Sequence, residues 1–501
     1  MELMYVPIVI FAIYYALRYY FTRTFNYWKD RNVPYPEPVP FFGNMKESVL
    51  RNINMGMLYQ KIYNMFPDEK VIGFYRMTTP CLLVRDLDVV KNIMVKDFDL
   101  FSDRGWEFSK QGLSENMFHA TGDTWKLLRT RFSPVFTVSK LKNMFYLLEQ
   151  HADEMVKFIN ERVDKNPKQD VRAIMQRYTI GAVFACMFGI DIETMSNEMN
   201  SFQEIDRLTL TPNYGLELDM MYQGILKTLR LPFFPAKVTN FFYNLMQSVI
   251  DQRNGKPSNK NDFMDAILEM REAAKIMTSK NGGDERQLEI TLEVIAAQLF
   301  VFYVGGYETS ATTMTYLLHE ISVNPHVQDK LIEEIDLSLA ENDGKITYET
   351  LKEMKYLEKV FNETLRMHSL VEPLQRRANV DYEIPDTNVS VKKGQIIFVS
   401  PRAIHFDAKH WPNPEVFDPE RFSPEAVGNR HPCAYLPFGV GPRNCIGMRF
   451  GQVQSRLGIA KFLSQFRVEL AEGTPKKLDV EPNRLMIAPK EDVILNLVPR
   501  K

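Results

Sequence analysis

A cysteine in a glycine-rich loop constrains this chain more than any other feature. The segment 438–447 reads FGVGPRNCIG, so three glycines and one proline accompany Cys445. Such a segment can turn tightly and bring its backbone close to a flat partner. We predict a long amphipathic helix directly after Cys445, which would then cap that helix, and the positive helix end would lower the pKa of the thiol. The sequence therefore offers a thiolate for a metal, with an inert buried cysteine as the alternative.

Helical periodicity dominates the chain from about Pro34 onward. Strand-like runs are short, at 71–75, 81–84 and 395–399, and no repeat or low-complexity linker divides the chain. We therefore expect one large, mainly α-helical domain with small β-sheets. Its predicted helices cover 140–166, 172–188, 238–253, 262–277, 290–323, 348–367 and 448–466.

A long apolar stretch precedes this domain. Residues 3–21 carry one charge, Arg18, and as a helix they would span roughly 28 Å, close to the hydrocarbon thickness of a bilayer. Basic residues follow the stretch, so the positive-inside rule places the bulk of the chain in the cytosol. No basic n-region or small-residue cleavage site is present, so we favour an uncleaved transmembrane helix over a signal peptide or a core helix. The predicted organisation is an anchor at 1–21, a basic, proline-rich linker at 22–43 and a globular catalytic domain at 44–501.

Charge and cysteine content exclude two other classes of protein. The 61 Lys+Arg and 63 Asp+Glu leave a net charge of -2, so no global basic field exists to gather nucleic acid. Four cysteines in 501 residues do not form a dense disulfide framework, and reduced cytosolic thiols are the simpler interpretation.

The loop around Cys445 resembles the haem-ligand loop of the cytochrome P-450 superfamily, F-x-x-G-x-R-x-C-x-G, at every specified position. The resemblance implies a mainly helical prism with small sheets, and a haem b whose iron is bound by the Cys445 thiolate. It also implies that Arg443 pairs with a haem propionate and that Phe438, Gly439 and Gly447 shape the loop against the haem. Thiolate ligation is known in this family to favour O–O cleavage.

Other arginines resemble the propionate partners of that family. Trp125 and Arg129 lie at i and i+4 on one predicted helix face, like the family's W-x-x-x-R clamp. Arg376 stands where the family supplies another propionate contact, although its neighbour Arg377 leaves the choice between the two open. Any of these arginines could instead be a solvated surface residue.

A second motif points to a structural role. Glu363 and Arg366 share a predicted helix face at i, i+3, where a carboxylate and a guanidinium can pair through two hydrogen bonds. Together with Arg421 they resemble the E-x-x-R and P-x-R-F elements of the same family. The resemblance implies a buried triad that supports haem incorporation and takes no part in the chemistry.

The segment 305–310, GGYETS, carries two adjacent glycines inside a predicted buried helix. Each glycine costs roughly 1 kcal/mol relative to alanine in a helix interior, so we infer a local opening that admits a small ligand beside the Thr309 hydroxyl. Alternatively, Thr309 bonds back to the Gly305 carbonyl. The segment resembles the family's oxygen-activation motif, which implies that Thr309 positions protons on bound dioxygen and that Glu308 belongs to the proton-supply route. The threonine favours a monooxygenase.

The segments 101–105, 134–137 and 261–264 are most similar to the insect microsomal group known as family six. Its members oxidise lipophilic foreign chemicals, such as plant toxins and insecticides, and some endogenous lipids and hormones. The resemblance implies substrate-cavity positions at Phe108, Phe118, Phe302 and Leu370. Glu372 could recognise a cationic group, but we expect it to face solvent because an unpaired buried carboxylate is costly. The apolar tip 231–234 could dip into a membrane or pack in the core.

The resemblance also implies partners. No flavin or nicotinamide fingerprint is present, so electrons must come from a separate NADPH-cytochrome reductase, with cytochrome b5 as a further donor that the family allows. Lys126, Arg131 and Arg449 are candidates for a basic docking patch. The implied location is the endoplasmic reticulum membrane. Two alternatives remain: a haem-thiolate isomerase or dehydratase of lipid peroxides, and a non-enzymatic haem sensor.

Overall fold

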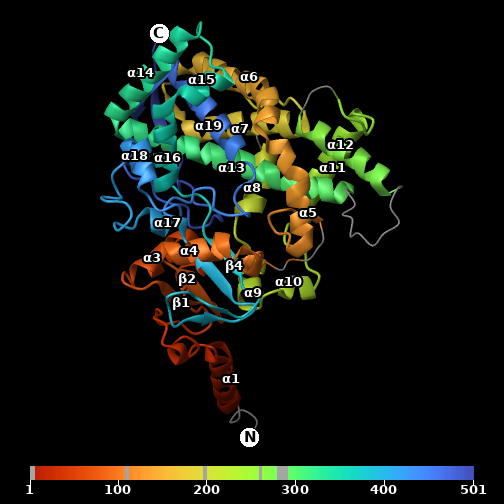
Figure 1. Cartoon of the computed structure of the whole chain (residues 1–501), viewed down its shortest axis with the longest axis vertical. Coiled ribbons are helices and arrows are strands. Elements are labelled where there is room, and N and C mark those ends of the chain that lie inside the picture. Colours follow the sequence, from red (N-terminus) through yellow and green to blue (C-terminus); the bar gives the residue numbers. More distant parts are fainter. Residues whose placement is uncertain are drawn as a thin grey trace.

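The computed structural model describes residues 6–106, 108, 112–195, 200–258, 262–278 and 291–500. Helices form most of it, and the larger sheet lies near the end from which the first helix projects (Figure 1). The α-helices are α1 (Val6–Thr22), α2 (Lys46–Val49), α3 (Met55–Asn64), α4 (Leu87–Lys91), α5 (Gly122–Phe132), α6 (Val138–Val163), α7 (Val171–Val183), α8 (Asn200–Leu210), α9 (Tyr214–Met221), α10 (Ile225–Thr228), α11 (Ala236–Gln252), α12 (Phe263–Thr278), α13 (Leu292–Val323), α14 (Pro325–Glu341), α15 (Tyr348–Glu353), α16 (Lys355–Met367), α17 (Pro401–His405), α18 (Pro424–Gly428) and α19 (Met448–Leu463). The strands are β1 (Val71–Arg76), β2 (Thr79–Val84), β3 (Lys168–Asp170), β4 (Leu374–Arg377), β5 (Tyr382–Glu383), β6 (Ser390–Val391), β7 (Ile396–Val399), β8 (Phe466–Leu470) and β9 (Ile494–Pro499).

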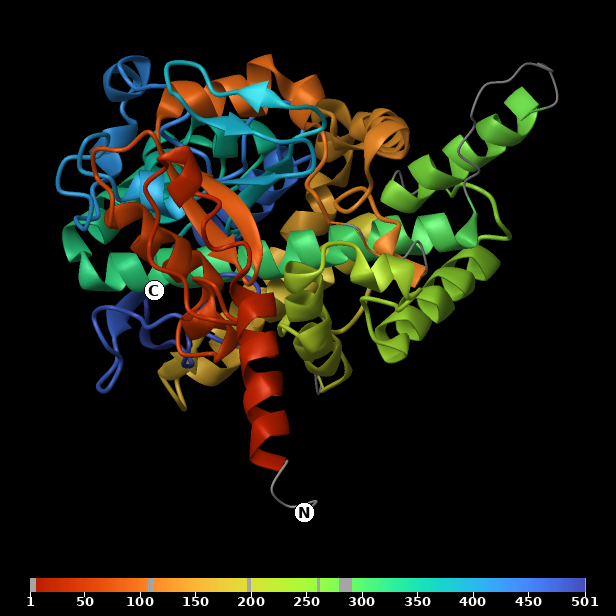
Figure 2. The same cartoon turned by 90° about the horizontal axis from the view of Figure 1, so that it is seen from below.

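The predicted mainly α-helical class is confirmed, and its centre is α13. This helix is apolar on most of its circumference, which is typical of a helix buried in a large protein. It crosses the middle of the molecule (Figure 2) and packs against α7, α11, α16 and α19. The Thr291 hydroxyl caps its N-terminus by accepting a hydrogen bond from Val294 N at 3.3 Å.

The largest sheet brings distant parts of the chain together in the order β1-β2-β7-β4. The predicted strands at 71–75, 81–84 and 395–399 are confirmed as β1, β2 and β7. β2 runs parallel to β7, and β4 runs antiparallel to β7 with Arg376 opposite Ile397. This pairing fixes the position of Arg376. The other sheets are β3-β9-β8 and β5-β6.

One predicted helix is wrong. The range 348–367 forms two helices, α15 and α16, which are interrupted at Met354. The reason is a tertiary contact, because the Glu334 carboxylate of α14 accepts hydrogen bonds from Tyr356 N at 2.7 Å and Leu357 N at 2.8 Å. These N–H groups belong to the first turn of α16, where they would otherwise have no partner.

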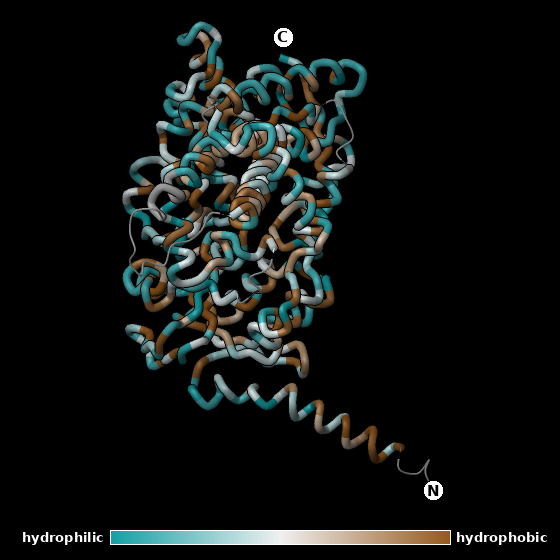
Figure 3. Tube along the Cα trace, turned by 90° about the vertical axis from the view of Figure 1, so that its right-hand side faces the viewer, coloured by the Kyte–Doolittle hydropathy of each residue, from teal (hydrophilic) through white to brown (hydrophobic). Residues whose placement is uncertain are grey.

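The N-terminal helix α1 projects away from the body, and its apolar side chains are exposed (Figures 1 and 3). Among the described residues, no helix combines the length and apolar character needed to cross a bilayer. Positions 3–5 of the predicted span lie outside the described residues. The predicted linker 22–43 is packed onto the domain at Trp28, which is fully buried and donates its indole N–H to Phe74 O at 3.1 Å.

Candidate active site

The loop before α19 holds Cys445 by backbone contacts. Cys445 N donates to Phe438 O at 2.8 Å, and Asn444 N donates to Gly441 O at 3.0 Å. Gly441 has φ +77°, and a Cβ there would lie 2.0 Å from Met94 O, so no other residue fits without moving the chain. The cap of α19 is Gly447, two residues after Cys445. The expectation that Cys445 itself caps this helix was therefore wrong.

The Cys445 side chain is exposed, whereas the other three cysteines of the chain are buried. It opens into a cleft that is also lined by Arg129, Ser133, Phe136, Asn444, Ile446, Met448 and Arg449. Desolvation by the surrounding protein raises the pKa of the Cys445 thiol, and the Gly447 N–H, Arg129 and Arg104 oppose this effect. The expectation that the helix end brings this pKa below its ordinary value was wrong, because desolvation outweighs the effect of the Gly447 N–H. A bound metal ion would remove the thiol proton outright.

Four arginines gather beside the Cys445 loop. Arg129 of α5 donates to Asn444 O at 2.9 Å and to Asn444 Oδ1 at 2.7 Å. Arg443 lies with its guanidinium 4.3 Å from the centre of the Trp125 ring and donates to Ala120 O at 2.8 Å. Arg104 donates to Arg443 O at 3.3 Å. The structure thus brings together Trp125, Arg129 and Arg443, which the sequence predicted as neighbours.

Arg376, from the end of β4, completes this group. It is 2% exposed, whereas Arg377 turns toward Asp103, with 3.4 Å between Nη2 and Oδ2. Burial lowers the pKa of Arg376 to about 10 and that of Arg443 to about 9, where Arg376 adds to the effect. Burial, followed by the charges of Arg443, Arg376 and Arg129, also lowers the pKa of Arg104.

Negative charge is scarce around these four arginines. Within the described part of the chain, their one ion pair joins Arg443 Nη2 to Asp103 Oδ1 at 3.7 Å. Buried nitrogens with no hydrogen-bond partner among the described residues include Arg376 Nε and Arg443 Nε and Nη1. Because unsatisfied buried donors are costly, the arrangement fits a ligand with two anionic groups. Haem b, with two propionates and an iron for the Cys445 sulfur, fits this donor set.

The structure also brings together the predicted triad. Arg366 donates to both carboxylate oxygens of Glu363, through Nε at 2.7 Å and Nη2 at 2.8 Å, and both residues are fully buried. Arg421 Nε lies 3.4 Å from Glu363 Oε1. Burial raises the pKa of Glu363, and Arg366 opposes the shift. The group joins α16 to the segment 418–422, away from the cleft lining.

The oxygen-side segment lies in an uninterrupted stretch of α13. Thr309 Oγ1 donates to Gly305 O at 2.6 Å, so the helix is closed at this point, as the alternative interpretation expected. Gly305 is exposed, and a Cβ added there would meet open space. α13 packs along α19, where a Cβ on Gly451 would lie 3.8 Å from Ser310 Oγ. The turn that follows the Cys445 loop is therefore beside the Thr309 segment.

Glu308 points into a buried polar network that the sequence did not reveal. Its carboxylate accepts hydrogen bonds from Arg484 at 2.7 Å, Gln176 at 3.2 Å and Arg172 at 3.4 Å. Arg484 also binds both oxygens of Asp206 at 2.9 Å. Burial by itself would lower the pKa of Arg484. The charges of Glu308 and Asp206 outweigh burial and raise this pKa. These partners come from three other segments, and no local motif could have identified them.

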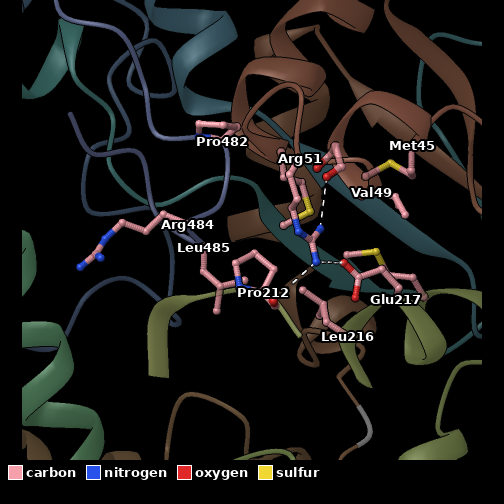
Figure 4. Close-up of a pocket in the computed structure, with 12 residues that line it drawn as sticks. Met45, Val49, Arg51, Pro212, Leu216, Glu217, Pro482, Arg484 and Leu485 are labelled. Carbon is pink, nitrogen blue, oxygen red and sulfur yellow. Dashed lines mark hydrogen bonds and ion pairs between the residues drawn. The ribbon is translucent and has the colours of Figure 1, made fainter. Parts of the chain in front are cut away.

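Arg484 also lines a small pocket where three segments meet (Figure 4). Its walls come from the segment around α2, from α9 and from the segment 482–485. Arg51 and Glu217 close it with an ion pair of 2.6 Å between Nη2 and Oε1. Arg484 thus connects the lining of this pocket to Glu308.

The predicted substrate-facing residues do not form one group. Phe108 stacks on Phe233 with 4.1 Å between ring centres, and Phe118 lies under the Arg104 guanidinium at 4.2 Å. Phe302 belongs to a separate aromatic cluster with Phe132, Phe136 and Phe263. Leu370 is buried, and its carbonyl accepts a hydrogen bond from Ile487 N at 2.9 Å.

The structure also shows how Glu372 and the tip 231–234 are packed. Glu372 is buried. Its carboxylate accepts one hydrogen bond from Ser400 Oγ at 2.9 Å and another from Arg402 N at 2.5 Å. The expectation that it faces solvent was wrong, because donors at the start of α17 satisfy it. At the tip, Phe233 and Phe234 are buried while Leu231 is 43% exposed.

Comparison with known proteins gives full-length matches. A model of the cytochrome P450 family matches residues 33–496. Cytochrome P450 6B2 of Helicoverpa armigera is 54% identical over 501 residues, covering 100% of this chain and 99% of the relative. Cytochrome P450 6B1 of Papilio polyxenes is 50% identical over 486 residues, 97% of both chains. Cytochrome P450 6a2 of Drosophila melanogaster is 37% identical over 491 residues, 96% of both.

Proposed function

Because this chain belongs to the cytochrome P450 family and is a haem-thiolate monooxygenase, we propose that Cys445 is the iron ligand and that lipophilic compounds are the substrates. The substrate classes are foreign chemicals, plant toxins and insecticides, or endogenous lipids and hormones. The observation that carries the assignment of the site is the exposed Cys445 thiol beside four arginines. Two of them, Arg376 and Arg443, are buried and have guanidinium nitrogens with no hydrogen-bond partner among the described residues.

Haem b, when bound, supplies the reductive activation of dioxygen. The residues of this chain hold and orient it: Cys445 provides the sulfur, and Trp125, Arg129, Arg376 and Arg443 provide propionate partners. We add Arg104 to these propionate partners because it donates a hydrogen bond to Arg443 O. Phe438, Gly439 and Gly447 keep the loop in its tight conformation, for which Gly439 has φ +67°.

Thr309 and Glu308 have different roles in proton transfer. The Thr309 hydroxyl donates to Gly305 O, so its oxygen lone pairs are free to accept a hydrogen bond from the open side of α13. Glu308 lies on the buried side with Arg484 and Arg172. Proton supply through Glu308 then requires a rearrangement of that ion network, which ties the rate of proton delivery to the segments that carry both arginines.

Aromatic packing supports lipophilic substrates. Phe108 and Phe233 form a stack that His119 and Trp106 border edge-on or at a tilt. Burial lowers the pKa of His119 to about 3, so its ring is neutral at physiological pH. Uncharged aromatic side chains of this kind suit contact with flat, apolar molecules better than contact with ions.

Membrane attachment and electron supply complete the proposal. Residues 1–21 anchor the chain in the endoplasmic reticulum membrane, with the catalytic domain in the cytosol. The exposed apolar side chains of α1 support membrane attachment. A 2.7 Å hydrogen bond between Tyr20 and Tyr222 ties α1 to the α9–α10 segment. A separate NADPH-cytochrome reductase, with cytochrome b5 as a further donor, would dock at Lys126, Arg131 and Arg449.

The test is the carbon monoxide difference spectrum of the reduced full-length protein in microsomes. We expect a strongly red-shifted Soret band in the wild type and in the control variant Cys433→Ala, and its loss in Cys445→Ala. A histidine-type band in the wild type, or an unchanged band in Cys445→Ala, would contradict the assignment. Hydroperoxide turnover without NADPH would favour the isomerase, and bound haem without substrate oxidation in the presence of reductase would favour the sensor.

A further inference from the structure

We propose that the protein carries a second metal site, for a divalent ion of the Zn²⁺ type, at His151, Glu154 and Asp191. One ligand atom from each of these residues lies within 4.8 Å of the others. His151 and Glu154 come from α6, and Asp191 follows the turn at Gly189. The cluster shares no residue with the Cys445 cleft, so this inference is independent of the proposed haem chemistry.

The gap between His151 and Asp191 has the size of a bridging metal. His151 Nε2 and Asp191 Oδ1 are 3.8 Å apart, which is too long for a hydrogen bond. Zinc binds imidazole nitrogen and carboxylate oxygen at about 2.0–2.2 Å, so one ion can touch both atoms at a ligand angle of about 130°, and a small movement of the exposed Asp191 side chain would bring that angle to the tetrahedral value. Asp191 is 68% exposed, which gives the ion access from solvent.

The His151 imidazole has a ring nitrogen that is suited to bind a metal. His151 is 1% exposed, and its buried Nε2 has no hydrogen-bond partner among the described residues. On the opposite side of the ring, Nδ1 lies 2.9 Å from Glu154 Oε2. A carboxylate that accepts a hydrogen bond from Nδ1–H fixes the tautomer and leaves Nε2 with a free lone pair, as in carboxylate–histidine–zinc triads.

Gln150 holds both carboxylates in place. Its side-chain amide donates to Glu154 Oε1 and to Asp191 Oδ2, each at 3.2 Å. We therefore assign His151 Nε2 and Asp191 as direct ligands, Glu154 as the positioning carboxylate, and water for the remaining positions. The ion would join α6 to the segment after Gly189 as a structural link.

The competing explanation is a protonated His151 that pairs with both carboxylates and needs no metal. A Zn²⁺ titration of the tag-free, full-length haem-loaded protein against a chromophoric chelator separates the two. The variants are Asp191→Asn, which changes an exposed side chain, and Glu154→Gln. The matched control is Asp164→Asn, an exposed aspartate at the end of the same helix.

We expect one saturable Zn²⁺ per chain in the wild type and in Asp164→Asn, with a melting temperature that rises as free Zn²⁺ increases. Both site variants should bind about 10- to 100-fold more weakly and lose the thermal shift, while the haem spectrum stays unchanged. The proposal is overturned if the wild type binds no Zn²⁺, or if all four chains bind it equally.

Discussion

At the scale of single residues, this protein buries carboxylates in two different ways. Glu308 is fully buried against guanidinium groups, so charge balances charge. Glu372 is buried against a hydroxyl and a backbone N–H, with no ion pair among the described residues. Desolvation therefore raises the pKa of Glu372 to about 8, although those donors and the Arg402 charge oppose it.

Substitution of Arg484 should destabilise the network around Glu308. Arg484→Gln leaves Glu308 and Asp206 facing one another with less positive charge, and breaking a buried ion pair costs about 3–5 kcal/mol. Adding Asp206→Asn removes one of the two carboxylates, so the double variant should recover part of the loss. Urea unfolding of the wild type, both single variants and the double variant measures this coupling. Additive effects would argue against a shared network.

The protonation of Glu372 should make the free energy of unfolding decrease as pH rises. Its folded pKa of about 8 lies above its ordinary value of 4.5, so the native state holds a proton that the unfolded chain has lost. The contribution of protonated Glu372 to the free energy of unfolding is fully present below about pH 4.5 and is lost as pH rises to about 8. Glu372→Gln stays neutral and should flatten the decline of the melting temperature between pH 5 and 8. An unchanged slope, compared with the exposed control Glu341→Gln, would contradict this.

At the scale of elements, turns and helix ends are set by contacts with other segments. The Cys445 loop touches the chain at Met94, and α16 begins where Glu334 of α14 meets its first N–H groups. Neither position can be moved without disturbing a second element. A loop that holds an iron ligand gains precision from such contacts, because the ligand then has one position relative to the helices.

Gly441→Ala tests this dependence. The Cβ would lie 2.0 Å from Met94 O, at a φ of +77° that costs a non-glycine residue about 1–2 kcal/mol before any clash. We expect haem content per chain to fall several-fold, with a lower melting temperature. The control is Gly428→Ala, where a Cβ meets nothing within 4 Å. Equal haem content in the two variants would show that the contact with Met94 is not needed.

At the scale of the whole molecule, apolar surface gathers at one end. α1 projects there (Figure 1), and Tyr20 contacts Tyr222 between α9 and α10. Exposed leucines at 218, 229 and 231 belong to the same segment. If the proposed anchor at 1–21 holds the chain in a membrane, the exposed apolar groups of the α9–α10 segment should add a second contact with that membrane.

Deletion of residues 1–22 should separate these contributions. We expect the full chain to stay in the membrane pellet after an alkaline carbonate wash, whereas the shortened chain is released by that wash. In mild buffer, part of the shortened chain should remain bound through Leu218, Leu229 and Leu231, and aspartate at all three positions should release it. Release of the full chain by carbonate would contradict the anchor.

The sequence by itself determined the features that depend on neighbouring residues. Helical periodicity located several long helices, including α6, α11 and the buried α13, but it missed α8 and α14; the short strands β1, β2 and β7 were also predicted. The spacing around Cys445 indicated the family, and the i, i+3 spacing of Glu363 and Arg366 predicted their pairing, because such residues share a helix face whatever the rest of the chain does.

Only the tertiary structure decided the features in which distant segments meet. It placed Arg376 rather than Arg377 among the arginines, because pairing with β7 determines which side chain turns inward. It buried Glu372, joined Arg484 to Glu308 and divided α15 from α16. In each case the partner lies 21 or more residues away along the chain, as Ile397 does from Arg376 and Glu334 does from Tyr356. Burial and charge pairing depend on proximity in space, and no local pattern of residues records that proximity.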